Sequence, residues 1–146
     1  MVTVTRRLNA SPAQVWEVLA DGWLYPLWVV GASRMREVDD EWPQPGARLH
    51  HSVGAWPMLL DDYTEAVEVE PASVLGLHAR AWPTGAASVT LRLHAVGRET
   101  EVAITEDVVR GPGLLVPRPL RHAALRWRNV ETLRRLAYVA ERRSAA

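Results

Sequence analysis

The chain has 146 residues, 48% of them hydrophobic, and its 17 acidic and 17 basic side chains give a formal net charge of zero. This length is typical of one domain with a substantial core, and the balanced charge argues against a nucleic-acid-binding protein. The absence of cysteine excludes disulfide bonds, cysteine nucleophiles and thiolate metal sites.

The first part of the chain predicts a strand followed by two short helices. Residues 2–8 (VTVTRRL) alternate and are rich in β-branched side chains, which is typical of a strand. Ser11 is a favourable N-cap and Pro12 suits the first position of a helix, so a helix is expected to follow. Pro26 limits the next apolar segment to a short second helix or a turn.

The middle of the chain predicts six strands. Short turns such as EPAS, PTGA and GRE separate them, and such turns leave no room for crossover helices. Consecutive strands are therefore expected to form an antiparallel meander. The predicted strands cover residues 33–39, 48–56, 59–70, 73–82, 87–96 and 100–109.

The end of the chain predicts one long helix, from about residue 119 to 143, about 37 Å in length. Leu133 and Leu136 lie on its core face, and it is the element large enough to cover the apolar face of the sheet. The predicted fold is α+β, with a curved antiparallel sheet of about seven strands wrapped around this helix. The space between sheet and helix is a natural ligand pocket.

Four stretches resemble the START-like helix-grip superfamily, also called SRPBCC, which includes polyketide cyclases and lipid-transfer domains. They are ASPAQVWEVLAD (10–21), YPLWVVGASRMREVD (25–39), WPQPGARLHHSVG (42–54) and TLRRLAYVAE (132–141). The second and third are similar to small bacterial proteins labelled polyketide cyclase or dehydrase. The resemblance covers almost the whole chain and implies one helix-grip domain over residues 1–146. It implies no catalytic residue, because the superfamily has no shared catalytic motif.

The long helix carries polar side chains in line with its buried leucines. At 100° per residue, His122, Arg126 and Asn129 fall on one stripe that continues into the core face. A buried arginine needs a counterion, so Arg126 is expected to pair with Glu106, or failing that with Glu65. Its remaining donors would then meet a carbonyl or carboxylate of a ligand.

Strand alternation predicts that four polar residues face the same interior, namely His51, Tyr63, Glu65 and Glu106. Trp28 and Trp56 are further candidates for the mouth of a pocket, where an indole offers an apolar face and an N–H donor. Ordinary core packing is the alternative for both indoles. The predicted ligand-binding residues are Trp28, His51, Tyr63, Leu91, Ile104, Glu106, His122, Arg126 and Asn129.

Two functions fit these features. One is a binding module for a small hydrophobic or aromatic molecule, such as a lipid, a polyketide or another metabolite. The other is a polyketide cyclase or dehydratase, with His51, Glu65 and Glu106 as acid/base candidates. For Glu65 and Glu106 the alternative is a solvated position or a structural ion pair with Arg126, and for His51 it is a hydrogen-bonded structural role.

The spacing of residues indicates no metal site and no cofactor. His50 and His51 are adjacent on a predicted strand and would point to opposite faces, so they do not form a chelate. The N-terminus has no apolar signal segment, so a cytoplasmic protein is expected. The expected partner is a small hydrophobic molecule, with no nucleic acid and no stable membrane insertion, for a monomer or a homodimer.

Overall fold

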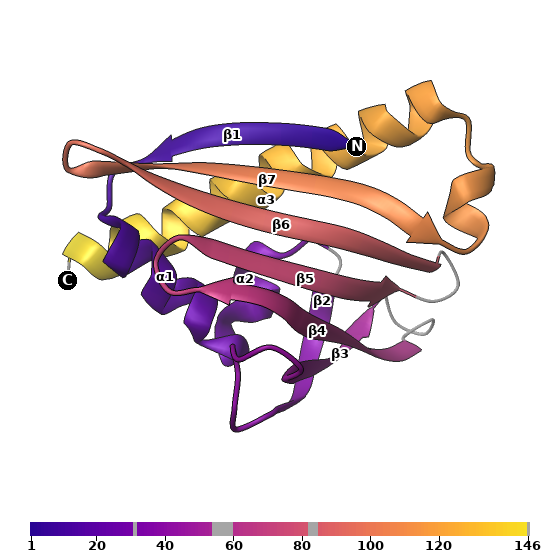
Figure 1. Cartoon of the computed structure of the whole chain (residues 1–146), viewed down its shortest axis with the longest axis horizontal. Helices are drawn as coiled ribbons and strands as arrows, with labels where there is room; N and C mark the ends of the chain where they lie inside the picture. The colour runs from indigo at the N-terminus through magenta and orange to yellow at the C-terminus, as the bar shows by residue number, and fades with distance from the viewer. Residues whose placement is uncertain (31, 54–59, 82–84, 146) are drawn as a thin grey trace.

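The computed structural model describes residues 1–30, 32–53, 60–81 and 85–145. Seven strands and three α-helices follow in the predicted order, with two 3-10 turns between them (Figure 1). The strands are β1 Val2–Leu8, β2 Ala32–Val38, β3 Arg48–Val53, β4 Leu60–Glu70, β5 Val74–Ala81, β6 Gly85–Val96 and β7 Glu99–Arg110. The helices are α1 Pro12–Ala20, α2 Tyr25–Trp28 and α3 Arg118–Ala145, and the 3-10 turns are η1 Gly22–Leu24 and η2 Pro112–Leu115.

The strands form one antiparallel sheet in the order β1-β7-β6-β5-β4-β3-β2. Strands β2 to β7 pair with their neighbours in the chain, as the short turns predicted. Strand β1 is the exception, because it pairs with β7 at the far end of the chain, with Val4 opposite Ile104. This long-range pairing places the N-terminal strand at the edge of the sheet beside α3 (Figure 1).

The start of α1 follows the local sequence closely. The Ser11 side chain accepts a hydrogen bond from the Gln14 backbone N–H, and the Gln14 side chain accepts one from the Ser11 backbone N–H. This reciprocal capping box satisfies two donors that the first helical turn leaves free. Helix α1 therefore begins where Ser11 and Pro12 predicted it.

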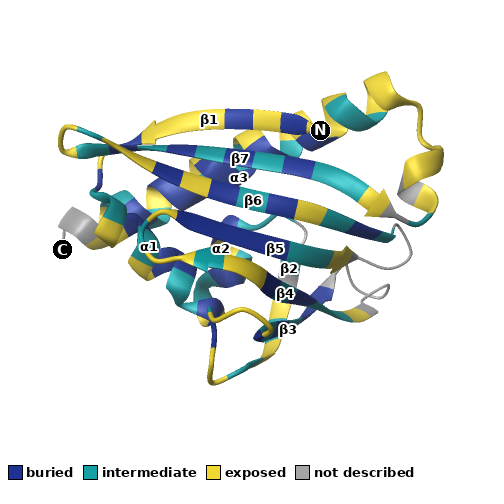
Figure 2. Ribbon diagram, viewed as in Figure 1, coloured by how far each residue is buried: buried dark blue, intermediate teal, exposed yellow. Residues whose placement is uncertain are grey.

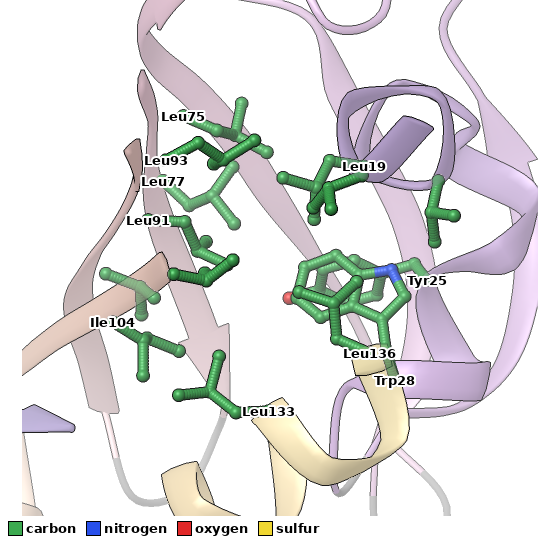
Figure 3. Packing of buried hydrophobic residues seen from close by; sticks show 14 of the residues in the cluster. Leu19, Tyr25, Trp28, Leu75, Leu77, Leu91, Leu93, Ile104, Leu133 and Leu136 are labelled. Atoms are coloured by element: carbon green, nitrogen blue, oxygen red, sulfur yellow. The ribbon is translucent and has the colours of Figure 1, made fainter. Parts of the chain in front are cut away.

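Helix α3 covers the interior face of the sheet and packs against β1, α1 and α2. Leu133 and Leu136 are both fully buried, which confirms the predicted core face of the helix. Figure 2 shows the buried residues concentrated on the strands of the sheet and on the inner side of the helices. In Figure 3, Leu91 and Ile104 of the sheet lie across the core from Tyr25 and Trp28 of α2. The fold is the predicted α+β helix grip.

None of the helices in the described ranges has the length and hydropathy needed to cross a bilayer.

Candidate functional site

A group of polar and aromatic side chains lies in the interior between the sheet and helices α2 and α3. We call it the interior polar cluster, and its members come from α2, β3, β4, β7 and α3. They are Tyr25, Trp28, His51, Thr64, Glu106, Arg128 and Asn129. All except Arg128 are at most 5% exposed.

Tyr25 occupies the centre of the interior polar cluster. Its ring stacks on the His51 ring with 5.6 Å between centroids and meets the edge of Trp28 at 5.2 Å. Its hydroxyl lies 3.2 Å from Thr64 Oγ1, and Thr64 Oγ1 lies 2.8 Å from His51 Nε2. The short helix α2 and strands β3 and β4 are thus joined through one buried hydrogen-bonded chain.

The hydrogen-bonded chain has two possible directions. If Tyr25 donates to Thr64 and Thr64 donates to His51 Nε2, a neutral His51 carries its proton on Nδ1; in the opposite direction the proton is on Nε2. Burial lowers the pKa of His51 from its usual 6.5, and nearby Asp62 opposes this shift only in part, so the neutral ring is favoured. Nδ1 of this neutral ring is therefore a donor when Nε2 accepts from Thr64, and an acceptor when Nε2 donates.

Glu106 and Arg128 form an ion pair between β7 and α3. Glu106 is 3% exposed and Arg128 is 37% exposed, so the arginine connects the buried carboxylate to the surface. Desolvation lowers the pKa of the Arg128 guanidinium. Desolvation by burial raises the pKa of Tyr25, so its phenol stays protonated.

Three buried nitrogen atoms of the interior polar cluster have no hydrogen-bond partner in the described structure. They are Trp28 Nε1, His51 Nδ1 and Asn129 Nδ2. The indole nitrogen and the amide nitrogen are donors, and His51 Nδ1 is a donor when its Nε2 accepts. Buried polar atoms in folded proteins are normally paired, so these three nitrogen atoms need partners that the described residues do not supply.

The predicted pair between Arg126 and Glu106 is wrong, because Arg128 is the partner of Glu106. Arg126 is exposed, whereas Asn129 is buried as predicted. At constant angle the buried face of α3 continues from Asn129 to Leu125, and Arg126 and Arg128 lie at its two edges. Glu106 pairs with the arginine at one edge, Arg128, and Arg126 at the other edge is exposed.

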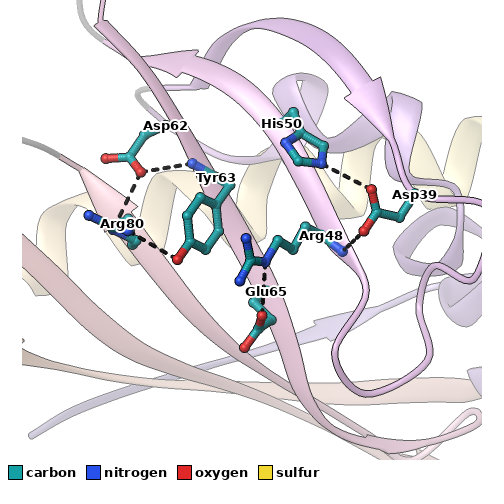
Figure 4. A network of polar contacts seen from close by, with 7 residues as sticks. All are labelled: Asp39, Arg48, His50, Asp62, Tyr63, Glu65 and Arg80. Atoms are coloured by element: carbon teal, nitrogen blue, oxygen red, sulfur yellow. Dashed lines mark hydrogen bonds and ion pairs between the residues drawn. The ribbon is translucent and has the colours of Figure 1, made fainter.

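The predicted inward faces of Tyr63 and Glu65 are also wrong. On β4 the fully buried side chains are Thr64 and Ala66. A bulge between Ala66 and Glu68 adds one residue to the strand, so only the residues after the bulge face the side that was predicted. Tyr63 and Glu65 lie on the outer face (Figure 4).

The outer face of β3, β4 and β5 instead carries a surface network of charged side chains around Tyr63 (Figure 4). The guanidinium groups of Arg48 and Arg80 lie 4.1 Å and 4.9 Å from the centroid of the Tyr63 ring. Arg48 Nε also pairs with Glu65 Oε1 at 3.0 Å. Glu65 is therefore in a structural ion pair, which was the alternative to a role in acid/base chemistry. This network holds three strands together and has no part in the interior polar cluster.

The other predicted site residues have mixed positions. His51 and Glu106 are buried on the predicted faces, and Leu91 and Ile104 belong to the hydrophobic core. His122 is half-buried, and its Nε2 lies 3.3 Å from the N-terminal nitrogen of Met1. Trp56 lies outside the described residues.

Sequence reasoning missed Thr64 and Arg128. For Thr64 a signal was present, because Glu65 and Glu68 are three residues apart and regular alternation cannot place both on the outer face. That odd spacing indicates one extra residue in the strand between Glu65 and Glu68. With both glutamates on the outer face, Thr64 and Ala66 face the interior. For Arg128 no local signal distinguished it from Arg126, since both flank the exposed Trp127.

A separate pocket of about 600 Å³ opens at the surface beside α1 and η1. It shares no residue with the interior polar cluster. Its lining residues are Glu17, Ala20, Asp21, Gly22, Trp23, Val38, Asp39, Asp40, Trp42 and Arg143. In the part of the chain that the structure describes, no group of three or more His, Asp or Glu side chains is arranged to hold a metal ion.

The sequence pattern of the family described as "Polyketide cyclase / dehydrase and lipid transport" matches residues 1–141. No curated protein matches the chain. Solved structures share its fold over nearly the full length of both chains. Protein NE0264 from Nitrosomonas europaea has a TM-score of 0.76 at 16% identity and covers 99% of this chain and 96% of its own.

Of two other similar solved structures, one has a name that states an activity and the other does not. Protein MLL2253 from Mesorhizobium loti has a TM-score of 0.70 at 20% identity, with 97% of this chain and 96% of its own covered. The Zhui aromatase/cyclase from Streptomyces sp. R1128 has a TM-score of 0.72 at 22% identity, with 98% and 94% covered. At these identities the similarity shows the fold.

Proposed function

Because the chain belongs to the polyketide cyclase/dehydrase and lipid transport family, we propose that it binds a small hydrophobic or aromatic ligand between the sheet and α3. The apolar part of the ligand contacts the core residues around Leu91 and Ile104. Its polar end meets the interior polar cluster. This division matches the usual composition of ligand sites, which are mainly apolar with a few placed polar groups.

The observation that carries the proposal is that buried nitrogen atoms of Trp28, His51 and Asn129 have no hydrogen-bond partner among the described residues. An unpaired buried donor costs about 1–3 kcal/mol, so a ligand that accepts from it gains affinity. Trp28 Nε1 and Asn129 Nδ2 are N–H donors, which favours ligands with carbonyl or other acceptor oxygens over pure hydrocarbons. Arg128 adds charge-assisted donors at the partly exposed side of the same region.

Two matched probes test the proposal, namely 1-tetralone and tetralin, which share a bicyclic skeleton and differ by one carbonyl oxygen. Both are titrated into the full chain labelled with nitrogen-15, and the Trp28 indole N–H and the His51 ring are followed by NMR. Tetralone is expected to bind more tightly, by roughly two- to twelvefold, because one hydrogen bond contributes about 0.5–1.5 kcal/mol. The Trp28 indole resonance is expected to shift with tetralone and to saturate.

The control variant is Trp23→Phe, because Trp23 is 58% exposed and lies outside the interior polar cluster. Trp28→Phe removes the donor while keeping an aromatic ring, so the advantage of tetralone is expected to shrink in this variant alone. Equal affinity for the two probes would contradict the role of the donors. Shifts confined to surface residues, without saturation for either probe, would contradict the binding site itself.

A second candidate function is a cyclase- or dehydratase-type enzyme, and the neutral His51 favours it. A neutral imidazole N–H can polarise a bound carbonyl and so promote loss of a proton from the adjacent carbon. Against it, Glu106 is paired with Arg128 and Glu65 with Arg48, so neither carboxylate is an unpaired base. Binding is therefore the function that the geometry supports better.

The same ketone separates the two functions. In deuterated water, an enzyme of this type is expected to speed the exchange of the protons next to the carbonyl of 1-tetralone. A binding protein leaves that exchange at the rate of the protein-free solution. Exchange that is accelerated by the native chain and abolished in His51→Phe, while tetralone still binds, would establish the enzyme.

A further inference from the structure

The connection between β7 and α3 exposes an unusual number of apolar side chains. Leu115 is 85% exposed, Trp127 71%, Leu120 65%, Leu114 46% and Val116 42%. Figure 2 shows this end of the molecule, η2 and the first turns of α3, as mainly exposed. Neighbouring exposed apolar side chains on a folded protein mark a surface that contacts something other than water.

The same connection is basic. From residue 108 to residue 130 the sequence has five arginines, one histidine and no acidic residue, in a chain whose net charge is zero. Arg118 and Arg126 are exposed in the same segment as the apolar side chains. We call the combination the η2–α3 surface, which consists of Leu114, Leu115, Val116, Arg118, Leu120, Arg126 and Trp127.

The apolar turn of the η2–α3 surface is held in place and does not fold back onto the core. Arg121 donates to the backbone carbonyl oxygens of Leu114 and Val116, at 3.3 Å and 3.4 Å. Leu125 and Asn129, on another side of the same helix, are buried. The η2–α3 surface is therefore separate from the interior polar cluster, although both use α3.

We propose that the η2–α3 surface docks reversibly on an anionic lipid bilayer. Exposed leucines can enter the boundary between head groups and acyl chains, while the arginines pair with lipid phosphates. A nucleic acid would use the arginines but leave Leu115 and Leu120 in water. An acidic protein would need a matching apolar groove. This contact is peripheral, and it stands independently of the ligand proposed for the interior.

Vesicle co-sedimentation of the full chain tests the proposal. The vesicles consist either of phosphatidylcholine alone or of equal parts phosphatidylcholine and phosphatidylglycerol. The native chain is expected to bind the anionic vesicles at least about tenfold more tightly than the neutral ones. Both Leu115→Ser/Leu120→Ser and Arg118→Gln/Arg126→Gln are expected to lose most of this binding, because each removes one of the two contributions.

Matched controls lie on the outer face of the sheet, where Val67 and Arg92 are exposed. Val67→Ser and Arg92→Gln are expected to bind vesicles like the native chain, and thermal unfolding checks that every variant is folded. Absence of binding to anionic vesicles would overturn the proposal, as would equal losses in the control variants. Tighter binding to duplex DNA than to the vesicles, lost in the arginine variant alone, would instead assign the surface to a nucleic acid.

Discussion

Glu106 on β7 and Arg128 on α3 form an ion pair that joins the sheet to the long helix. The carboxylate is almost fully buried and the guanidinium is about one-third exposed. Arg128 directly precedes Asn129 on α3, whose buried amide nitrogen has no hydrogen-bond partner among the described residues.

Removing the arginine is expected to destabilise the protein strongly. Arg128→Met leaves a buried carboxylate without its counterion, and the free energy of unfolding is expected to fall by about 3 kcal/mol, the lower end of the range for a broken buried pair. Arg126→Met is the matched control, with a change within about 0.5 kcal/mol for an exposed side chain. Urea unfolding measures both. Equal losses in the two variants would contradict the role of Arg128.

The double variant separates the ion pair from simple packing. Glu106→Gln/Arg128→Met removes both charges, so its loss of stability is expected to be smaller than that of Arg128→Met alone. A loss of stability equal to the sum of the losses in Glu106→Gln and in Arg128→Met would show that the pair has no coupling energy.

The stability of the protein is expected to fall with pH below about 6.5 because of His51. Burial lowers the pKa of this ring in the native state, so the unfolded chain binds a proton at a pH where the native chain does not. The contribution of His51 to stability is thus fully present above about pH 6.5 and is lost as the pH falls toward the native pKa of His51. The lowered pKa values of Asp39, and of Glu131 at about 2, act at lower pH and stay outside this window.

Urea unfolding at about pH 7.5 and about pH 5.5 measures this effect. His51→Gln removes the titrating group, so its two unfolding free energies are expected to differ less than those of the native chain. His94→Gln, at an exposed position on β6, is expected to keep the native dependence on pH. The prediction fails if the native chain and His51→Gln show the same slope.

Truncating the core face of α3 is expected to cost much more than truncating its exposed face. Leu133 is fully buried, so Leu133→Ala is expected to lower the free energy of unfolding by about 2–5 kcal/mol. Leu120 is 65% exposed, and Leu120→Ala is expected to change it by less than about 0.5 kcal/mol. Chemical denaturation of both variants distinguishes them, and a small loss for Leu133→Ala would contradict the observed packing.

Several features of this protein were determined by the sequence alone. The cap at Ser11, the alternation of β6 and β7, and the leucines of α3 depend on local periodicity, and they led to the observed fold. The burial of His51 and Glu106 followed in the same way, because each shares a regular strand face with apolar neighbours. Asn129 was placed by its spacing from the buried leucines.

The partners of these polar side chains were decided only by the tertiary structure. A single bulge in β4 exchanged Tyr63 and Glu65 for Thr64, and so supplied the hydroxyl that orients His51. The packing of α3 on the sheet brings Arg128, rather than Arg126 at the opposite edge of the buried face, to Glu106. Periodicity fixes which side of an isolated element is apolar, but one extra residue or a rotation about an axis depends on contacts between distant segments. The interior polar cluster therefore forms only when β3, β4, β7, α2 and α3 pack together.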